Sequence, residues 1–399
     1  MHKPLDNTNN AVSATQKGTT RQSTEAANET KPCCTSAAAP GEPPLCLGAD
    51  VTLDAYLPDD PGDLSNMRKA IPRIARDRRV VDAVEGKLRQ VPTHHSLWQA
   101  DARDLACIPS DSVQLILTSP PYWNLKAYND VDGQLGRIND YEAFVSALAF
   151  ILDELYRVLV PGGRLVIVVG DVALARRQNK GRHVVVPLHA TIQESCREIG
   201  FDNLAPIIWN KIGNARYESV GAGFYGTPYE PNGIIKNEIE YLLFQRKPGG
   251  YRTRTDAARI LSVISQPQRN AWLRQVWTDI PGVARNEHPA PFPEELAERL
   301  VRMFSFVGDT VLDPFLGSGT TSVAAARFGR NSLGCDIDGQ YLAGAVDRLE
   351  REARSAAGQR PIAVHTLEAM TTGDSTTPGA GSLRLDDLPP VSAGTQALN

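Results

Sequence analysis

The segment VQLILTSPPYWNLKAY, residues 113–128, contains the strand and turn around which the rest of the chain can be organised. Its first five residues are apolar or β-branched at all but one position, which predicts a buried strand. Pro120 and Pro121 end that strand, because proline cannot donate a hydrogen bond to a neighbouring strand and has a fixed φ angle. Ser119 and Tyr122 are therefore expected in a stiff turn at the carboxyl end of a strand, where open α/β sheets bind their ligands.

A turn of this composition can hold a planar group that carries an amine. The Tyr122 ring offers a face for stacking, and the Ser119 hydroxyl can accept a hydrogen from the amine. The carbonyl oxygens of Ser119 and Pro120 are further acceptors at the same place. The alternative interpretation is that Ser-Pro-Pro-Tyr is only a tight turn, and the tetrapeptide alone does not decide between the two.

Length and composition restrict the class of protein. The 399 residues are 42% hydrophobic and 22% charged, so the chain can bury a large core in one domain with tails or in two domains. No apolar run approaches membrane-spanning length, and the first ten residues lack the apolar stretch of a signal peptide. We therefore expect a cytoplasmic, nucleoid-associated protein of a bacterium or archaeon. The six cysteines form no CxxC pair and the seven histidines show no ligand spacing, so we expect no metal.

Changes in composition divide the chain into regions. Two terminal regions are poor in bulky apolar residues and are expected to be disordered. A basic helical stretch, Asn66 to Arg89, interrupted at Pro72, precedes the core; it can cap the core or contact phosphates, but a solvated charged face is the favoured interpretation. The predicted regions are a tail at 1–50, a helical extension at 51–97, a core half at 98–213, a target-recognition region at 214–287, a second core half at 288–354 and a flexible tail at 355–399.

Strand and helix patterns alternate through both core halves. Apolar residues at helical spacing, followed by short apolar runs of strand length, recur with proline or glycine between them. This alternation predicts an α/β fold with a doubly wound, mostly parallel sheet covered by helices on both faces. The predicted elements are helices at 141–160, 187–199, 293–304 and 322–328, strands at 164–169, 204–209, 239–244, 310–313 and 333–336, and a last helix carrying residues 341–349.

A second ligand-binding pattern lies at TVLDPFLGSGTT, residues 310–321. A strand, a glycine-rich loop, a helix and a second strand ending in an acid, Asp336, form the unit that binds adenosine-containing cofactors. The loop is not a phosphate-binding P-loop, because no lysine follows Gly319, and it lacks the third glycine of the dinucleotide pattern. It begins instead with Asp313, which suits a ligand that carries a cationic amine.

These two motifs together resemble the S-adenosylmethionine-dependent amino-methyltransferases of DNA. Ser119 to Tyr122 match the family's target-amine motif, (Asp/Asn/Ser)-Pro-Pro-(Tyr/Phe/Trp), and Asp313 to Thr320 match its cofactor motif, Asp-Pro-Phe-x-Gly-Ser-Gly-Thr. The target-amine motif comes first, as in the permuted beta group of restriction-modification enzymes. The resemblance extends over about residues 98–349 and implies a Rossmann-like methyltransferase fold.

The resemblance also implies roles for individual residues. Asp313 would bind the methionine amine of S-adenosylmethionine, Phe315 would pack near the sulfonium, and Asp336 would accept hydrogen bonds from the ribose hydroxyls. Asp101 would contact the adenine edge or cap a helix, and Asp338 is a neighbouring turn residue. The loop residues that would complete the cofactor site are Gly317, Ser318, Gly319 and Thr320.

The implied reaction is direct methyl transfer to an exocyclic amine of a base in double-stranded DNA. The base must leave the duplex to reach the cofactor, so it would be flipped and stacked on Tyr122, with Trp123 as a second wall. Methylation of cytosine C5 would need a cysteine nucleophile, and Cys107, the nearest cysteine, lies before the strand and is interpreted as a core residue. Within the family, serine at the position of Ser119 accompanies N4 of cytosine, so we expect N4-cytosine methylation, with N6 of adenine as the alternative.

A basic segment within the target-recognition region is the expected contact for DNA. The segment from Arg246 to Arg274 contains seven Lys or Arg residues and one acidic residue. Its local charge is therefore +6 in a chain of net charge −4. Methylation of RNA or of a protein glutamine, and a catalytically inactive DNA-binding protein, are the other functions considered. A cognate restriction endonuclease acting on the same site is a further expected partner. The residues expected to contact DNA are Arg246, Lys247, Arg252, Arg254 and Arg259.

Overall fold

The computed structural model describes residues 51–125, 128–211, 237–283, 292–354 and 360–367. No helix among these residues has the length and apolar character needed to cross a membrane. The strands are β1 (Thr93–Gln99), β2 (Val113–Thr118), β3 (Leu159–Val169), β4 (Val172–Leu174), β5 (Val184–Val186), β6 (Asp202–Asn210), β7 (Ile239–Arg246), β8 (Val276–Trp277), β9 (Thr310–Asp313), β10 (Asn331–Asp336) and β11 (Ile362–Leu367).

Nine α-helices and three short 3₁₀ helices accompany these strands in the described part of the chain. The α-helices are α1 (Met67–Ile74), α2 (Arg78–Leu88), α3 (Tyr141–Val158), α4 (Leu188–Ile199), α5 (Asp256–Leu261), α6 (Gln266–Trp272), α7 (Glu294–Phe304), α8 (Thr320–Arg327) and α9 (Gly339–Arg354). The 3₁₀ helices are η1 (Leu53–Tyr56), η2 (Leu135–Arg137) and η3 (Arg176–Gln178).

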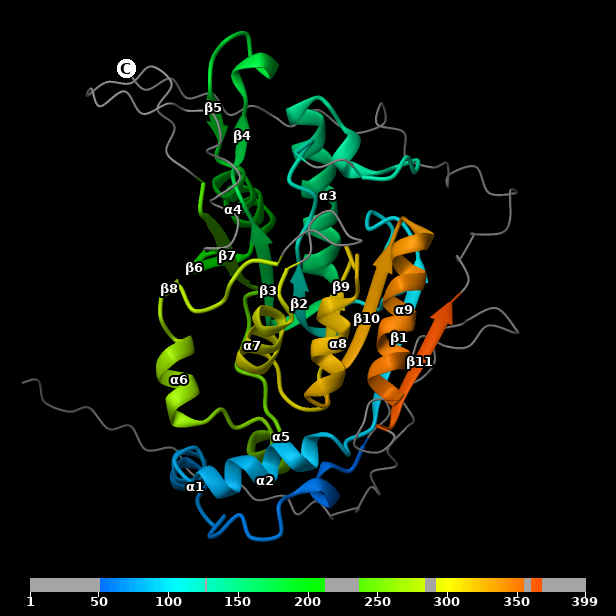
Figure 1. Ribbon diagram of the computed structural model, residues 1–399. Helices are drawn as coiled ribbons and strands as arrows, with labels where there is room; N and C mark the ends of the chain where they lie inside the picture. Colours follow the sequence, from blue (N-terminus) through cyan, green and yellow to red (C-terminus); the bar gives the residue numbers. More distant parts are fainter. Residues whose placement is uncertain (1–50, 126–127, 212–236, 284–291, 355–359, 368–399) are drawn as a thin grey trace, which may run out of the picture. The chain divides into compact units, whose positions relative to one another are not determined.

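Nine strands form one sheet in the order β11-β1-β10-β9-β2-β3-β7-β6-β8, and β4 pairs with β5 in a separate hairpin. All pairings in the large sheet are parallel except those of β7, which is antiparallel to both β3 and β6. The predicted doubly wound, mostly parallel α/β fold is therefore confirmed. The strands β2 and β9 lie side by side, so the two motifs found in the sequence end at the same edge of the sheet (Figure 1).

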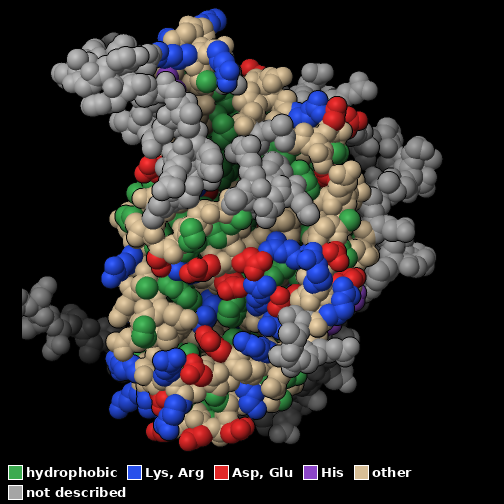
Figure 2. Space-filling view, viewed as in Figure 1, with side chains coloured by type: hydrophobic (Ala, Val, Ile, Leu, Met, Phe, Trp, Pro, Cys, Tyr) green, Lys and Arg blue, Asp and Glu red, His purple; other side chains and the backbone are tan. Residues whose placement is uncertain are grey.

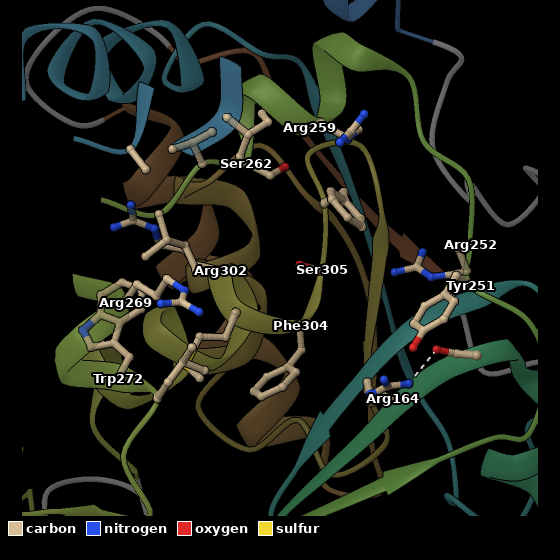
Figure 3. Close-up of a pocket in the computed structure, with 18 of the residues that line it drawn as sticks. Arg164, Tyr251, Arg252, Arg259, Ser262, Arg269, Trp272, Arg302, Phe304 and Ser305 are labelled. Atoms are coloured by element: carbon tan, nitrogen blue, oxygen red, sulfur yellow. Dashed lines mark hydrogen bonds between the residues drawn. The ribbon is translucent and has the colours of Figure 1, made fainter. Parts of the chain in front are cut away.

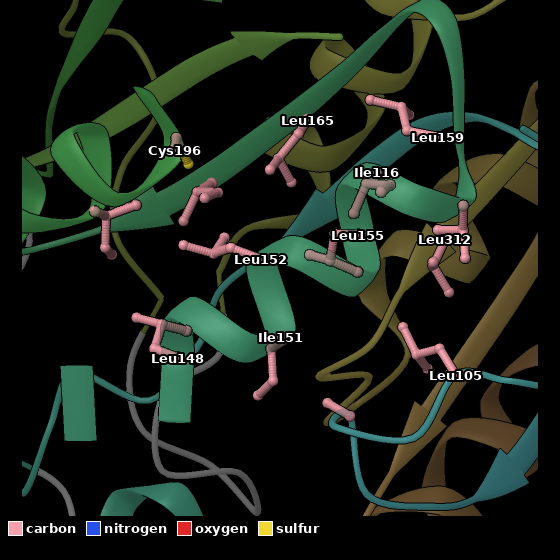
Figure 4. Packing of buried hydrophobic residues seen from close by; sticks show 14 of the residues in the cluster. Leu105, Ile116, Leu148, Ile151, Leu152, Leu155, Leu159, Leu165, Cys196 and Leu312 are labelled. Atoms are coloured by element: carbon pink, nitrogen blue, oxygen red, sulfur yellow. The ribbon is translucent and has the colours of Figure 1, made fainter. Parts of the chain in front are cut away.

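Helices cover both faces of this sheet. On one face, α3 and α4 pack on the side chains of Ile116, Leu165 and Ile167. Figure 4 shows Leu152 and Leu155 of α3 on the side of the helix that is turned towards Ile116 and Leu165. On the other face, α7 and α8 pack on the alternate residues of the same strands, including Leu115 and Leu117. The apolar run in β2 is continuous because successive side chains of a strand point to opposite faces, and both faces are buried.

Three strands of the sheet were not predicted, namely β1, β11 and the two-residue strand β8. β1 has the sequence THHSLWQ, and its register with β10 and β11 places it inside the sheet; it crosses the predicted boundary between the helical extension, 51–97, and the first core half. β11 lies in the region 355–399, for which a flexible tail was expected, and six of its residues pair with β1. The helical stretch 66–89 is confirmed as α1 and α2, but the break falls at residues 75–77, and Pro72 lies within α1.

The predicted target-recognition region, 214–287, is divided in the structure. Residues 212–236 and 284–291 lie outside the described residues. β7 of this region is an interior strand of the sheet, between β3 and β6, whereas α5, α6 and β8 lie at its periphery. A separate cluster of buried residues joins α1, α2 and α5 below the sheet (Figure 1), with Ile74, Val84 and Ile260 at its centre.

Candidate active site

A narrow cleft opens at the carboxyl edge of the sheet, where β1, β2, β9 and β10 end. Residues from both sequence motifs line it, so the fold brings together segments that are far apart in the chain. The cleft lies where the parallel strands release their loops, as expected for a ligand site in this class of fold. Its lining includes Asp101, Ser119, Pro121, Tyr128, Leu135, Pro314, Phe315, Asp336, Ile337 and Tyr341.

The target-amine turn is fixed by hydrogen bonds to the neighbouring strand β3. The Ser119 hydroxyl donates to the carbonyl oxygen of Val168 at 3.1 Å, and the Tyr122 hydroxyl donates to the same oxygen at 3.3 Å. The two hydroxyl oxygens are 3.3 Å apart. Because the Ser119 proton is directed at Val168, the remaining lone pairs of this oxygen are available as acceptors. Pro120 and Pro121 are buried and hold the turn in place.

The Tyr122 ring is buried and does not present an open face on which a base could stack. Only 8% of the residue is exposed, and it does not belong to the lining of the cleft. Burial raises the pKa of its hydroxyl well above the ordinary value, and the nearby Glu240 carboxylate contributes to the increase. The hydroxyl is therefore neutral and acts as a hydrogen-bond group.

An ion pair beside the target-amine turn was missed by the sequence analysis. Lys211, directly after β6, pairs with Glu240 of β7, and their side chains are 20% and 10% exposed. Glu240 also lies against Gly170, where an added Cβ would be 3.3 Å from Glu240 Cγ and 3.3 Å from a ring carbon of Tyr122. The only sequence signal is the position of both residues at predicted strand ends, because the β6–β7 pairing brings them together.

Trp123 has an unusual backbone and packing. Its φ angle is 48°, in the left-handed region that non-glycine residues rarely adopt. Its ring packs edge-on against Tyr141 of α3 at 5.2 Å between centroids. Its indole nitrogen has no hydrogen-bond partner among the described residues. The structure thus places Trp123 against helix α3, and its role as a second wall for the base stays a prediction.

Asp336 occupies the position expected of the acid that binds a ribose. One carboxylate oxygen accepts a hydrogen bond from the Gly317 amide at 2.8 Å, and the other accepts one from the Asp338 amide at 2.9 Å. Asp336 lines the cleft, and burial raises its pKa. Asp338 caps the start of α9 through the amide of Gln340, at 2.8 Å. Asp336 therefore links the glycine-rich loop to the end of β10 and keeps acceptor capacity towards the cleft.

Asp313 lies behind the cleft. It is 1% exposed, and its two carboxylate oxygens accept hydrogen bonds from the hydroxyls of Thr118 and Thr321, each at 2.8 Å. The Phe315 amide donates to it at 3.1 Å. Burial raises its pKa from 3.8 to about 6. Asp313 thus joins β9, β2 and α8, whereas the sequence analysis expected it to contact the methionine amine of the cofactor.

The other residues of the glycine-rich loop differ in whether they line the cleft. Gly319 has a φ angle of 74° at the start of α8, and a Cβ there would lie 2.8 Å from that of Ala345, so only glycine allows α9 to pack this closely. Ser318 and Thr320 are bonded to the guanidinium of Arg348 on α9, with the Ser318 carbonyl at 2.9 Å and the Thr320 hydroxyl at 3.0 Å. Phe315 lines the cleft, but Gly317, Ser318, Gly319 and Thr320 do not.

Asp101 lies at the cleft and forms an ion pair with Arg103. One of its carboxylate oxygens accepts hydrogen bonds from the Arg103 amide and side-chain Nε, both at 2.9 Å. It begins a turn after β1 and caps no described helix. A second contact of Arg103, with the Gly133 carbonyl at 3.3 Å, ties this turn to the opposite wall. Contact with an adenine edge stays a prediction for Asp101.

The residues expected to contact DNA lie away from this cleft. Arg246 pairs with Asp202, and Lys247 pairs with Asp111. Arg252 and Arg254 share the buried carboxylate of Asp309, and Arg259 pairs with Asp256. Arg246 is opposite Arg164 at the start of the β3–β7 pairing, which is the amino edge of the parallel strands. Their contact with DNA stays a prediction, but their position is at the edge opposite Ser119.

The residues of the cleft fit the predicted cofactor, S-adenosylmethionine. Asp336 offers carboxylate oxygens suited to a ribose diol, while Ile337, Tyr128 and Tyr341 offer apolar and aromatic surface for an adenine ring. Phe315 and Ser119 line the same cleft. Asp313 does not line the cleft, and its contact with the methionine amine stays a prediction.

Comparisons with known proteins agree with this description. A sequence profile of the DNA methylase family matches residues 113–347. The Type II methyltransferase M.MjaI of Methanocaldococcus jannaschii is 36% identical over 278 residues, which are 62% of this chain and 88% of that protein. M.MthZI of Methanothermobacter thermautotrophicus is 32% identical over 271 residues, 62% of this chain and 74% of its own.

A solved structure supports the same assignment. A candidate DNA modification methylase from Thermus thermophilus, complexed with S-adenosyl-L-methionine, is 51% identical and superimposes with a TM-score of 0.57, covering 69% of this chain and 99% of its own. The matched profile spans both motifs, and the fold places both motifs at one cleft. The chain therefore belongs to the DNA methylase family, the S-adenosylmethionine-dependent N6/N4 amino-methyltransferases of the restriction-modification type.

Proposed function

We propose that the protein methylates the exocyclic N4 amine of a cytosine that is flipped out of double-stranded DNA. The observation that carries this proposal is that Ser119, of the target-amine motif, and Asp336, of the cofactor unit, line one cleft. An amine held at Ser119 is then adjacent to a cofactor bound at Asp336. When bound, S-adenosylmethionine supplies a methyl group on a sulfonium that an amine lone pair can displace. The protein's contribution is mainly positioning and exclusion of water.

Ser119 is the residue that orients the amine in this proposal. Its own proton is given to the Val168 carbonyl, so its oxygen accepts a hydrogen from the amine. This hydrogen bond turns the amine lone pair away from the serine and towards the methyl donor. Because the turn is stiffened by Pro120 and Pro121, the acceptor is already in place before the base arrives.

Tyr122 and the Lys211–Glu240 pair would form the wall of the base pocket. A flipped base must displace part of the packing that now covers the Tyr122 ring, since only 8% of this residue is exposed. The energetic gain is base–aromatic stacking in place of stacking within the duplex. Lys211 can donate to a ring nitrogen or carbonyl of the base, and Glu240 holds Lys211 in position.

Serine at the first position of the target-amine motif supports cytosine over adenine. In the family that the chain resembles, serine accompanies N4-cytosine methylation, whereas aspartate or asparagine accompanies N6-adenine methylation. All of these side chains offer an oxygen to an amine, so N6 of adenine is the second candidate. We further propose that the part of region 214–287 that precedes β7 selects the DNA sequence, and that an endonuclease of the same specificity is the partner, as for Type II systems.

The test is single-turnover transfer of a labelled methyl group from S-adenosylmethionine to DNA, followed by digestion to nucleosides and mass spectrometry. The proposal predicts N4-methylcytosine at one short sequence motif. N6-methyladenine as the product would favour the second candidate instead. Transfer to RNA or to a protein glutamine, with none to DNA, would refute the assignment of the substrate. Ser119→Ala should abolish the product, while Ser112→Ala, outside the cleft, is the matched control.

A further inference from the structure

A second and larger cavity lies below the amino edge of the sheet. It has a volume of about 870 Å³ and is enclosed by α1, α5, α6, the end of α7 and the facing ends of β3 and β7. Seven arginines line it, and no aspartate or glutamate does so among the described residues. We call this cavity the arginine pocket. It unites the two basic segments of the sequence, 66–89 and 246–274, which are far apart in the chain.

The pocket carries a net positive charge after its ion pairs are considered. Four of its arginines have carboxylate partners, which are given above for Arg246, Arg252 and Arg259, while Arg302 pairs with Glu85. The other three, Arg76, Arg164 and Arg269, have no carboxylate partner among the described residues.

Two of the three unpaired arginines, Arg76 and Arg269, are exposed to solvent. Arg164 donates to the Gly162 carbonyl at 2.8 Å. Burial lowers the pKa of Arg164, and the nearby charges of Arg246 and Arg252 lower it further. Repulsion among these cations is a cost that a bound anion would relieve.

Figure 3 shows how the walls of the pocket are arranged. Arg164, Arg252 and Tyr251 stand on one side, and Arg269 and Arg302 stand on the other, near Trp272. Tyr251 is 98% exposed, so its ring is free to stack or to pack on a sugar. The Trp272 ring is not available for stacking in the same way, because the guanidinium of Arg302 lies 5.1 Å from its ring centre. Arginines on opposite walls suit a ligand with several separated phosphates better than a single phosphate ion.

The arginine pocket and the cleft that contains Ser119 and Asp336 open at opposite edges of the sheet. Arg164 pairs in register with Leu115, whereas Ile167 pairs with Thr118, which directly precedes Ser119. The Leu115–Arg164 pair and the Thr118–Ile167 pair are three residues apart along the strands, which is about 10 Å. The pocket extends further in the direction away from Ser119. A duplex whose base enters the cleft at Ser119 lies over the carboxyl edge. The pocket therefore faces away from that duplex.

We propose that the arginine pocket binds the phosphate backbone of a second segment of double-stranded DNA, separate from the segment that is methylated. The proposal rests on the proposed function in taking DNA as the polyanion. In Figure 2, Lys and Arg side chains gather at the end of the molecule where Figure 1 places α1, α2 and α6, with acidic side chains among them. Contacts to phosphates from Arg76, Arg164 and Arg269 would bind DNA without regard to sequence. Such a site would keep the enzyme on DNA between transfers.

The test compares Arg76→Gln/Arg269→Gln with a matched control, Arg351→Gln/Arg354→Gln. The two control arginines are on α9, more than 60% exposed, and their loss removes the same charge. Titration with a short duplex that contains the methylation site should give two bound duplexes for the wild type and the control, and in the pocket variant the second duplex should bind more weakly. The slope of log affinity against log salt for the second duplex should fall by about 1.8 with two lost phosphate contacts.

Single-turnover transfer at saturating DNA separates this proposal from the proposed function. The rate should be unchanged in the pocket variant, because neither arginine is near Ser119. A wild type that binds only one duplex, or a pocket variant that behaves as the control does, would overturn the second site. If the pocket variant loses both methyl transfer and the binding of the first duplex, the pocket holds the methylated segment instead. If the wild type transfers no methyl group to DNA, the proposed function fails, and the two-duplex titration still decides the pocket.

Discussion

Replacing Asp313 by asparagine should remove a pH-dependent part of the stability of the fold. Asp313 is 1% exposed, and burial raises its pKa from 3.8 to about 6. Because the pKa is higher in the folded chain, the folded state binds more protons than the unfolded state between these two values. The stabilisation is therefore fully present below pH 3.8 and is lost as the pH rises through about 6. At about 1.4 kcal/mol per pKa unit, this shift corresponds to about 3 kcal/mol.

Urea unfolding at a series of pH values measures this contribution directly. The free energy of unfolding of the wild type minus that of Asp313→Asn should decrease by about 3 kcal/mol between acidic and neutral pH. Asp153→Asn, at an exposed position on α3, is the matched control for the change of side chain. A difference for Asp313→Asn that stays constant, or that grows with pH, would refute the reasoning that Asp313 is buried at an energetic cost.

Three further predictions follow from the cleft and its surroundings. Asp336→Ala should weaken S-adenosylmethionine binding by about 1 to 3 kcal/mol, measured by calorimetry, because the ribose hydroxyls lose their acceptor; equal affinities would contradict this role. Ser119→Ala and Tyr122→Ala should abolish methyl transfer in single turnovers and retain cofactor binding, whereas a substantial rate in both would favour a simple turn. Arg252→Gln should lower the free energy of unfolding by about 1 to 3 kcal/mol, because buried Asp309 loses one of its two cationic partners; a change only in DNA affinity would argue for an exposed phosphate contact.

The parts of the fold that the sequence predicts are those whose signals are local. The strand at 113–118 and the loop after Asp313 could be placed because an apolar run meets proline or glycine within a few residues. Ser119 and Asp336 were assigned to one site for a topological reason as well, since the carboxyl ends of parallel strands share an edge. The structure supports that inference by placing both residues in one cleft.

The strand β1 escaped prediction because three of its five buried side chains are polar. His95 is fully buried between the hydroxyls of Ser332, at 2.8 Å, and Thr93, at 3.0 Å. Burial lowers its pKa to about 3, so the ring is neutral and can be accommodated in the sheet. A pattern based on apolar residues does not recognise such a strand, since the partner strand that supplies Ser332 is distant in the sequence.

The positions of charged residues were the least predictable. The sequence shows that residues 246–274 are basic, but it does not show that Arg252 and Arg254 meet the buried Asp309, or that Arg246 meets Asp202. Likewise, Lys211 and Glu240 become neighbours only through the pairing of β6 with β7. Charge along a sequence thus indicates a basic surface only after its ion pairs are known.

The pairing of β1 with β10 and β11, and of β2 with β9, has a consequence for the order of events during synthesis. A ribosome completes β2, β3, β6, β7 and β8 well before it reaches β9, and among the described strands these five have only one another as partners until then. Contacts between such distant segments form slowly, because a long loop must close first. We expect the nascent chain to expose the apolar edge of β2 during this interval, which is a period of risk for aggregation. Asp336 is added late, so a product truncated before residue 331 would contain the complete target-amine turn and yet lack the acid that we assign to the cofactor.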